Sequence, residues 1–183
     1  MRNKVRLIHT SDLHLGDDMG HPLADGALRA VVDSVSRLGG DMLLLVGDVF
    51  DHGRVPDSVL EAFLEEIARI TQPAVLLPGN HDLYDDNSLY QREVFQHKPD
   101  NLHIITQTDG EALSFPELTL EVWGRAMLSH TPAFRPLEGM PTQRNGHWMV
   151  ALAHGHFHFD DDRDQRSSPI YPPEIAAAPC DYL

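Results

Sequence analysis

Cysteine is almost absent from the sequence, where Cys180 is the only one. An internal disulfide is therefore excluded, and a reducing compartment is favoured. No apolar run approaches the roughly 18 residues that a membrane-spanning helix needs. The first residues also lack the apolar stretch and cleavage site of a signal peptide. We therefore predict a cytoplasmic protein that does not associate with a membrane.

Basic residues are scarce as well, since 14 Lys and Arg stand against 28 Asp and Glu, for a formal net charge of -14. Such a charge repels a nucleic-acid backbone and argues against a broad basic binding face. It does not exclude phosphate-containing substrates, because bound divalent cations would reverse the local field. Histidine, the commonest metal ligand among side chains, is abundant, with 12 residues.

The first part of the chain alternates between strand and helix patterns. Short apolar runs at 5–8, 42–46 and 74–77 are typical of buried strands. The segments between them, 23–38 and 56–70, carry apolar residues at helical spacing. This alternation predicts an α/β fold in which helices pack on a parallel sheet.

The second half of the chain is less regular. We predict strands at 101–106, 112–115, 118–123 and 148–153, a loop at 131–144, a helix at 172–178 and the start of a strand at 181–183. The length of 183 residues suits one domain with a hydrophobic core. We therefore predict a single domain over residues 1–183.

Polar clusters follow four of the predicted strands. They are Asp12-Leu13-His14, Gly47-Asp48-Val49-Phe50-Asp51, Gly79-Asn80-His81-Asp82 and the stretch from His154 to His158. In open α/β sheets, ligands bind at the carboxyl ends of the strands. We therefore expect the four clusters to converge on one site.

The residue types in these clusters suit divalent cations. Asp12 and His14 are two residues apart in a segment that we expect to be extended, so both side chains would point to one side and bind one ion together. Asp48 has two carboxylate oxygens and can bridge two ions, and Asn80 offers an amide oxygen. Mixed carboxylate, amide and imidazole ligands suit Mn, Fe or Zn.

The ordered set of motifs resembles the calcineurin-like metallophosphoesterase family. The match consists of DLH at 12–14, GDVFD at 47–51, GNHD at 79–82 and a strand-end histidine at 154. The resemblance implies a layered β-sandwich flanked by helices, with the site at the carboxyl ends of the strands. It also implies that Asp12 and His14 bind a first metal, that Asp48 bridges both metals, and that Asn80 and His154 bind the second.

The same resemblance implies the chemistry of the site. Two divalent ions, Mn in preference to Fe or Zn, would share a hydroxide that attacks phosphorus. His81 would not be a ligand but would stabilise or protonate the leaving oxygen. Asp51 would hydrogen-bond His81 and hold it protonated. His52 is interpreted either as a solvated side chain or as a phosphate contact.

A second histidine motif leaves an alternative open. The family's domain ends with Gly-His-x-His, and Gly155-His156-Phe157-His158 spells it, but directly after His154. His156 and His158 would share a side with His154 if the strand continued. Either this motif provides ligands, or the final motif lies beyond residue 183. We favour the second interpretation, in which the chain is a shortened piece with an incomplete first-metal site and reduced metal affinity.

The branch of the family bears on the substrate. SDLHLGD, GDVFD and PGNHD resemble bacterial DNA-repair exonuclease subunits, which implies a phosphodiesterase acting on DNA and an ATPase partner subunit. The net charge argues against a DNA substrate. His52 stands where the protein-phosphatase branch usually has Arg. The alternatives are a phosphomonoesterase acting on small molecules or phosphoproteins, and an inert binding or scaffold subunit.

Overall fold

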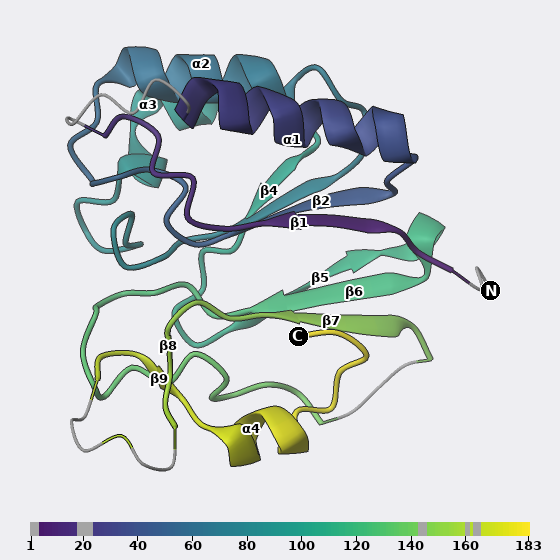
Figure 1. Ribbon diagram of the computed structural model, residues 1–183, viewed down its shortest axis with the longest axis vertical. Coiled ribbons are helices and arrows are strands. Elements are labelled where there is room, and N and C mark those ends of the chain that lie inside the picture. Colours follow the sequence, from purple (N-terminus) through teal and green to yellow (C-terminus); the bar gives the residue numbers. More distant parts are fainter. Residues whose placement is uncertain (1–3, 18–23, 143–145, 160–161, 163–165) are drawn as a thin grey trace.

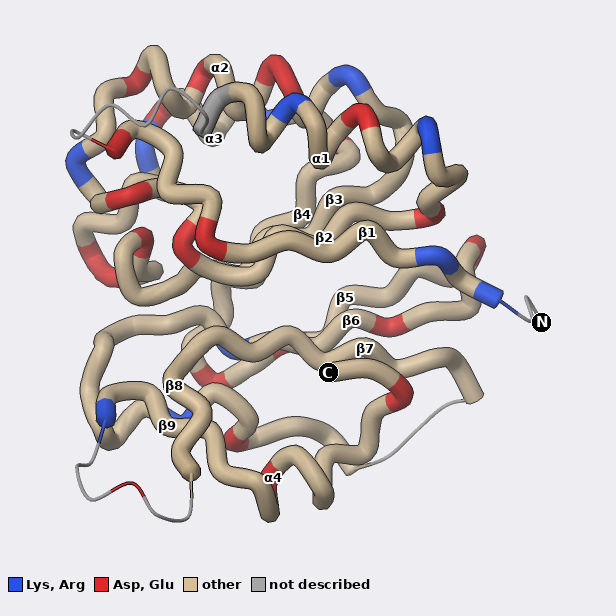
Figure 2. The backbone as a smooth tube through the Cα atoms, in the orientation of Figure 1, with Lys and Arg blue, Asp and Glu red and all other residues tan. Residues whose placement is uncertain are grey.

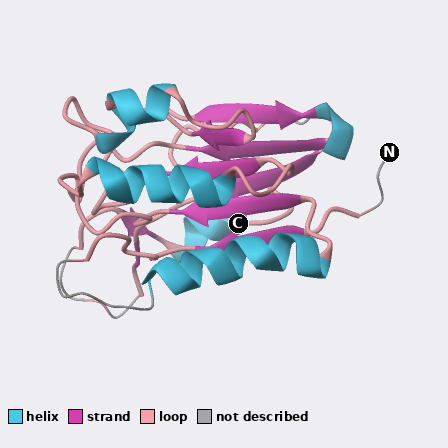
Figure 3. Cartoon of the chain, turned by 90° about the horizontal axis from the view of Figure 1, so that it is seen from above, coloured by secondary structure: helices cyan, strands magenta, loops and turns pink. Residues whose placement is uncertain are grey.

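A four-stranded parallel sheet forms the centre of the computed structural model, which describes residues 4–17, 24–142, 146–159, 162 and 166–183. Its strands, in spatial order, are β1 (Leu7–Thr10), β2 (Met42–Val46), β3 (Ala74–Leu77) and β4 (Leu102–Ile104). The helices α1 (Ala24–Leu38), α2 (Asp57–Ile67) and α3 (Glu93–Gln96) cover one face of this sheet (Figures 1 and 3). The predicted start of the first helix at residue 23 lies outside the described residues.

A second sheet covers the other face of the first. It consists of β5 (Glu111–Phe115), β6 (Leu120–Gly124) and β7 (Trp148–Leu152), where β6 pairs antiparallel with β5 and parallel with β7. The smaller elements are the 3-10 helices η1 (Leu89–Gln91) and η2 (Pro116–Leu118), the strand pair β8 (His156–Phe157) and β9 (Pro169–Ile170), and α4 (Pro172–Ala177). Figure 1 shows α4 beyond the second sheet. The predicted α/β fold with a helix-flanked β-sandwich is therefore confirmed.

The side chains of β2 explain why its sequence is apolar throughout. Leu43 and Leu45 pack among the helices in one core cluster, whereas Met42, Leu44 and Val46 belong to the cluster between the two sheets. Because successive residues of a strand point to opposite faces, a strand buried on both faces needs an apolar residue at every position. Because both faces of β2 are buried, the strand lies in the middle of the molecule. The loop that follows β2 therefore begins there as well.

The structure refines two expectations for the last part of the chain. The strand predicted for 148–153 ends at Leu152, and His156 belongs to β8, which pairs with β9 in a separate sheet. The strand predicted for 181–183 appears as a bridge between Tyr182 and Val150.

In the described part of the chain, no helix combines the length and hydropathy that crossing a bilayer requires.

Candidate metal centre

The loops that follow β1 and β2 run side by side beyond the ends of the strands. The amide of Asp12 donates to the carbonyl of Gly47 at 3.1 Å, and the amide of His14 donates to that of Asp48 at 3.0 Å. A bridge between Leu15 and Phe50 continues the same parallel pairing. The loops therefore leave the sheet together at the carboxyl ends of the strands, on the side of the molecule where β7 also ends (Figure 1). Figure 2 shows acidic residues in these loops.

Three residues of these loops have left-handed backbone conformations. The φ angles are 54° at Asp12, 47° at His14 and 50° at Asp48. Each such conformation costs a non-glycine residue roughly 1–2 kcal/mol, and such strain concentrates at functional sites. The expectation that Asp12 and His14 lie in an extended segment is therefore wrong. Hydrogen bonds between the loops hold the chain in a conformation that local preference opposes.

Two groups of potential metal ligands meet at this edge. One consists of His14, Asp48 and His81, and the other of Asp12, Asp48 and His154. Within each group, one ligand atom from each residue lies within 4.8 Å of the others. Asp48 belongs to both groups, and carboxylate with imidazole is a donor set that suits divalent Mn, Fe or Zn. Asp12 and His14 fall into different groups, although we expected them to bind one ion together.

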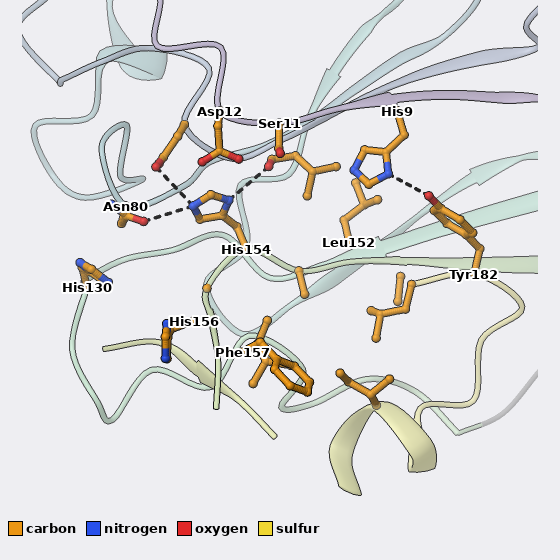
Figure 4. A pocket seen from close by; sticks show the side chains of 18 residues that line it. His9, Ser11, Asp12, Asn80, His130, Leu152, His154, His156, Phe157 and Tyr182 are labelled. Carbon is orange, nitrogen blue, oxygen red and sulfur yellow. Dashed lines mark hydrogen bonds and ion pairs between the residues drawn. The ribbon is translucent and has the colours of Figure 1, made fainter. Parts of the chain in front are cut away.

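His154 is surrounded by oxygen acceptors (Figure 4). Its Nδ1 lies 3.2 Å from the carbonyl of Val46, and its Nε2 lies 3.1 Å from Oδ1 of Asn80 and 3.4 Å from Oδ2 of Asp48. Burial by itself would lower the pKa of His154, but the hydrogen bond and charge of Asp48, together with the charge of Asp12 and the carbonyl of Val46, outweigh it and raise this pKa. A divalent cation would take the place of the proton on Nε2 among these oxygens.

Asp48 is buried, with 3% of its surface exposed. Its Oδ1 accepts a hydrogen bond from the amide of His81 at 2.9 Å, while Oδ2 faces His154. Burial favours a raised pKa for Asp48, but the hydrogen bonds from His154 and from the amide of His81, together with charge interactions with both histidines, outweigh it and lower the pKa. The group that both ligand sets share is thus held as a carboxylate, which is the form that binds metals.

The predicted contact between the Asp51 carboxylate and His81 is wrong. Oδ1 of Asp51 lies 2.9 Å from Nδ1 of His14, whereas Nδ1 of His81 lies 2.7 Å from the main-chain carbonyl of Asp51. The reason is the loop pairing described above, in which the amide of Asp51 donates to the carbonyl of Leu15. This pairing sets Asp51 beside the loop after β1. The rings of His14 and His81 meet edge to face, with 4.7 Å between centroids.

Two glycines allow the loops to approach the site closely. A Cβ atom at Gly47 would lie 2.1 Å from Nδ1 of His154, and Gly47 itself has a φ of 77°. A Cβ atom at Gly79 would lie 2.2 Å from Oδ1 of Asp48. Side chains at these positions would occupy the space of the candidate ligands, so glycine is needed at both.

We expect Gly47→Ala to lower the free energy of unfolding by at least about 2 kcal/mol, through the left-handed φ and the overlap with His154. Denaturant unfolding in the presence of EDTA measures this without metal. Gly53→Ala is the matched control, because nothing lies within 4 Å of a Cβ atom there, and we expect a change within about 0.5 kcal/mol. Equal stability of the two variants would contradict the packing of Gly47 against His154.

Three further predicted residues lie outside both ligand groups. Nδ1 of His52 accepts a hydrogen bond from the amide of Arg54 at 3.2 Å. Nε2 of His156 and Nδ1 of His158 lie 3.5 Å and 3.7 Å from Oδ2 of Asp162. Since β7 ends before His154, the three histidines do not share one side of a strand. Among the described residues, neither His156 nor His158 belongs to a ligand group, although His156 lines the same pocket as Asn80 and His154.

A pocket of about 690 Å³ opens beside the second ligand group, within the range of small-molecule sites. Asp12, Asn80 and His154 contribute polar groups to its lining. His9 and Tyr182 line the same pocket and are joined by a hydrogen bond of 2.9 Å (Figure 4). No role for His9 could be predicted from sequence, because no neighbouring residue completes a ligand pattern with it.

Asp82 is the other residue that sequence reasoning missed. It closes the GNHD motif and is fully buried, with 0% of its surface exposed. Burial raises the pKa of Asp82, and the hydrogen bonds from Tyr90 and from the amides of Gly79 and Phe50 act in the opposite direction. In sequence, Asp82 only follows the candidate ligand Asn80 and the candidate acid His81, and the motif alone does not reveal that it is buried.

A model of the family described as calcineurin-like phosphoesterase matches residues 5–173. One component of the nuclease SbcCD, from Escherichia coli K12, is 29% identical over 85 residues, which are 43% of this chain and 21% of that protein. The same component from Escherichia coli O157:H7 matches equally. The chain thus matches about a fifth of the length of these curated relatives.

Several solved structures are also similar. A dimetal phosphatase from Danio rerio is 16% identical, with a TM-score of 0.46 and coverage of 65% of this chain and 43% of that one. The nuclease MPE of Pseudomonas putida is 16% identical, with a TM-score of 0.40 and coverage of 90% and 72%. The phosphoesterase Yfce of E. coli is 20% identical, with a TM-score of 0.41 and coverage of 91% and 78%.

Proposed function

Because the chain belongs to the calcineurin-like phosphoesterase family, we propose that it is a metal-dependent phosphodiesterase that uses two divalent cations. The observation that carries this proposal is the pair of ligand groups that share Asp48. A shared carboxylate between two sets of ligands is the arrangement that a two-metal hydrolase needs. Manganese is the proposed metal because Asp, Asn and His oxygen and nitrogen donors dominate the site.

We propose that Asp12, Asp48, Asn80 and His154 hold one cation and that His14 and Asp48 hold the other. When bound, the cations supply charge to polarise the phosphoryl group and to activate water. The chain's own contribution is to fix the ligands: the carbonyl of Val46 orients His154, and the Asp51 carboxylate orients His14. Hydrogen bonds of this kind set the ring orientation and tautomer of a metal-binding histidine.

We propose that His81 serves as the acid that protonates the leaving oxygen. Its Nδ1 is engaged by the main-chain carbonyl of Asp51 at 2.7 Å. A ring nitrogen that donates to a carbonyl leaves Nε2 as the nitrogen available to a substrate. His81 is exposed, unlike Asp48, and can therefore reach a bound ester. In this role Asp51 orients His81 through its main chain and not through its carboxylate.

We further propose that the substrate is a diester of the kind found in DNA. The nuclease name of the SbcCD relatives supports a diester, and the net charge of -14 opposes tight binding of bare DNA. A partner subunit, which the resemblance identifies as an ATPase, would relieve this conflict by contributing DNA-binding surface.

We also propose that the chain forms a single domain and that it is cytoplasmic. The lone cysteine supports the cytoplasmic setting.

Metal content and three substrates test the proposal together. The protein is stripped with EDTA, dialysed, and loaded with excess MnCl₂ before metal analysis. Hydrolysis of bis(p-nitrophenyl) phosphate, p-nitrophenyl phosphate and linear DNA is then followed with and without Mn. We expect about two Mn ions per chain and at least about tenfold faster hydrolysis of the diester than of the monoester.

Each alternative has its own result. Faster cleavage of the monoester would replace the phosphodiesterase with a phosphomonoesterase. Near-zero metal even in millimolar Mn would favour an inert binding or scaffold protein. Cleavage of the small diester without cleavage of DNA would support the catalytic site and contradict DNA as the substrate of this chain on its own.

A further inference from the structure

Asp82 is a buried acidic residue that the proposed chemistry does not use. It follows Asn80 and His81 in sequence but belongs to neither ligand group. None of its surface is exposed. A carboxylate removed from water in this way needs hydrogen-bond donors around it, because an uncompensated buried charge is strongly destabilising. Its partners therefore show what holds it there.

Hydrogen-bond donors surround both oxygens of Asp82. Oδ1 accepts from the amides of Gly79 at 2.6 Å and Asp48 at 3.2 Å. Oδ2 accepts from the amides of Val49 at 2.9 Å and Phe50 at 3.2 Å, and from the hydroxyl of Tyr90 at 2.6 Å. An ionised carboxylate is the side-chain group that accepts at both of its ends without offering a proton.

Three of these donors are consecutive amides of the loop after β2. The amides of Asp48, Val49 and Phe50 converge on one carboxylate because Asp48 has a left-handed φ of 50°. Successive main-chain amides in such a turn form a concave anion-binding nest. Here the anion comes from the chain itself. The carboxylate of Asp82 therefore supports the strained conformation of the residue that both ligand groups share.

The same carboxylate also joins two loops. Gly79, which follows β3, donates to Oδ1 of Asp82 together with Asp48, which follows β2. The loops approach so closely that a Cβ atom at Gly79 would lie 2.4 Å from the amide nitrogen of Asp48. The amide of His81 in turn donates to the Asp48 carboxylate at 2.9 Å. Asp82 thus fixes the main chain on both sides of the candidate metal centre.

We infer that Asp82 is a positioning residue: its carboxylate holds the loop from Asp48 to Phe50 in the conformation that presents Asp48 to the metals, and it thereby sets metal affinity without binding a metal. The effect on metal affinity rests on the proposed function, whereas the effect on the loop rests on the hydrogen bonds alone. The two effects therefore call for separate measurements.

Asp82→Asn is the decisive variant because it keeps the size of the side chain. In either orientation its amide NH₂ would face two main-chain N–H groups, those of Gly79 and Asp48 or those of Val49 and Phe50, so donors would oppose donors. We expect 10- to 100-fold weaker Mn binding, as is typical when a group that orients a metal ligand is lost. In metal-free protein we expect at least about tenfold faster amide hydrogen exchange at Asp48, Val49 and Phe50, with little change at Leu43 to Leu45.

Ile67→Ala separates positioning from general loss of stability. Ile67 is fully buried at the end of α2 that leads toward β3, away from the carboxyl ends of the strands. Its truncation leaves a cavity that lowers global stability. We expect Mn affinity to stay within about twofold of the parent in this variant. Equal weakening of Mn binding in Ile67→Ala and Asp82→Asn would overturn the inference, as would unchanged Mn binding in Asp82→Asn.

Two further outcomes remain decisive. If Asp82→Asn does not fold, exchange in the metal-free parent protein still tests the loop: strong protection at Asp48, Val49 and Phe50 supports the inference, and exchange at the rate of an unstructured peptide overturns it. If the parent protein binds no Mn, the proposed function fails. The exchange measurement then still decides whether Asp82 holds the loop.

Discussion

Asp48→Asn is expected to abolish Mn-dependent turnover, with a loss on the order of a thousandfold or more. Several kcal/mol of charge stabilisation depend on the cations, and each 1.36 kcal/mol corresponds to a factor of about ten in rate. Asp48 belongs to both ligand groups, so one substitution weakens both proposed sites. Steady-state hydrolysis of bis(p-nitrophenyl) phosphate and metal analysis of the same samples measure the effect. Metal content should fall well below two per chain.

The same variant has a readout that needs neither metal nor substrate. The charge and hydrogen bond of Asp48 raise the pKa of His154 against the effect of burial. Without that charge the effect of burial is opposed less, so we expect the pKa of His154 to fall in Asp48→Asn. Titration of the histidine ring signals by NMR in EDTA measures it. An unchanged pKa would show that Asp48 does not face His154 in solution.

Asp100→Asn is the matched control for Asp48→Asn. Asp100 is exposed and precedes β4, so it lies at the amino ends of the parallel strands, whereas the candidate site lies at their carboxyl ends. The substitution removes the same charge from the same residue type. We expect turnover, metal content and the pKa of His154 to match those of the parent protein. Full metal content in Asp48→Asn would contradict the shared-ligand arrangement.

His81→Ala is expected to cut turnover by about 10²- to 10⁴-fold, which is the usual contribution of a positioned acid or base. Under the proposed role, metal content stays near two per chain. The loss should be larger for an ester with a poor leaving group than for a p-nitrophenyl ester, because a stable leaving anion needs less protonation. Steady-state kinetics with an alkyl and a p-nitrophenyl diester measure this difference.

His81 also lies in a ligand group with His14 and Asp48, which gives the experiment a second outcome. Loss of one metal per chain in His81→Ala would assign His81 as a ligand and contradict the acid role. His97→Ala is the control, since His97 is an exposed histidine at the end of α3 and belongs to neither ligand group. We expect that variant to behave like the parent protein in both measurements.

The layers of the fold could be predicted well from sequence because burial leaves a periodic trace. The apolar runs at 42–46 and 74–77 coincide with β2 and β3. The predicted helices correspond to α1 and α2, with ends that differ by a few residues in α2. The predicted ends of the later strands are less accurate, because the ends of short strands depend on pairing partners that local sequence does not specify.

Convergence of the polar clusters also followed from sequence, because each of them comes after a predicted strand. The placement of Asp12, Asp48 and His154 in one group agrees with that expectation. The assignments of these side chains as ligands remain predictions. What local sequence did not predict is that Asp12 and His14 would separate, since their left-handed conformations depend on hydrogen bonds to the neighbouring loop.

The sequence by itself determined that this chain buries parallel strands and gathers ligand-type residues where those strands end, since both follow from residue order and hydropathy. Tertiary structure alone decided that the Asp51 carboxylate forms a hydrogen bond with His14 and that the Asp82 carboxylate accepts one from the amide of Asp48. These choices depend on contacts between segments more than thirty residues apart. Such contacts offset the cost of strained backbone and buried charge, and no local pattern encodes them.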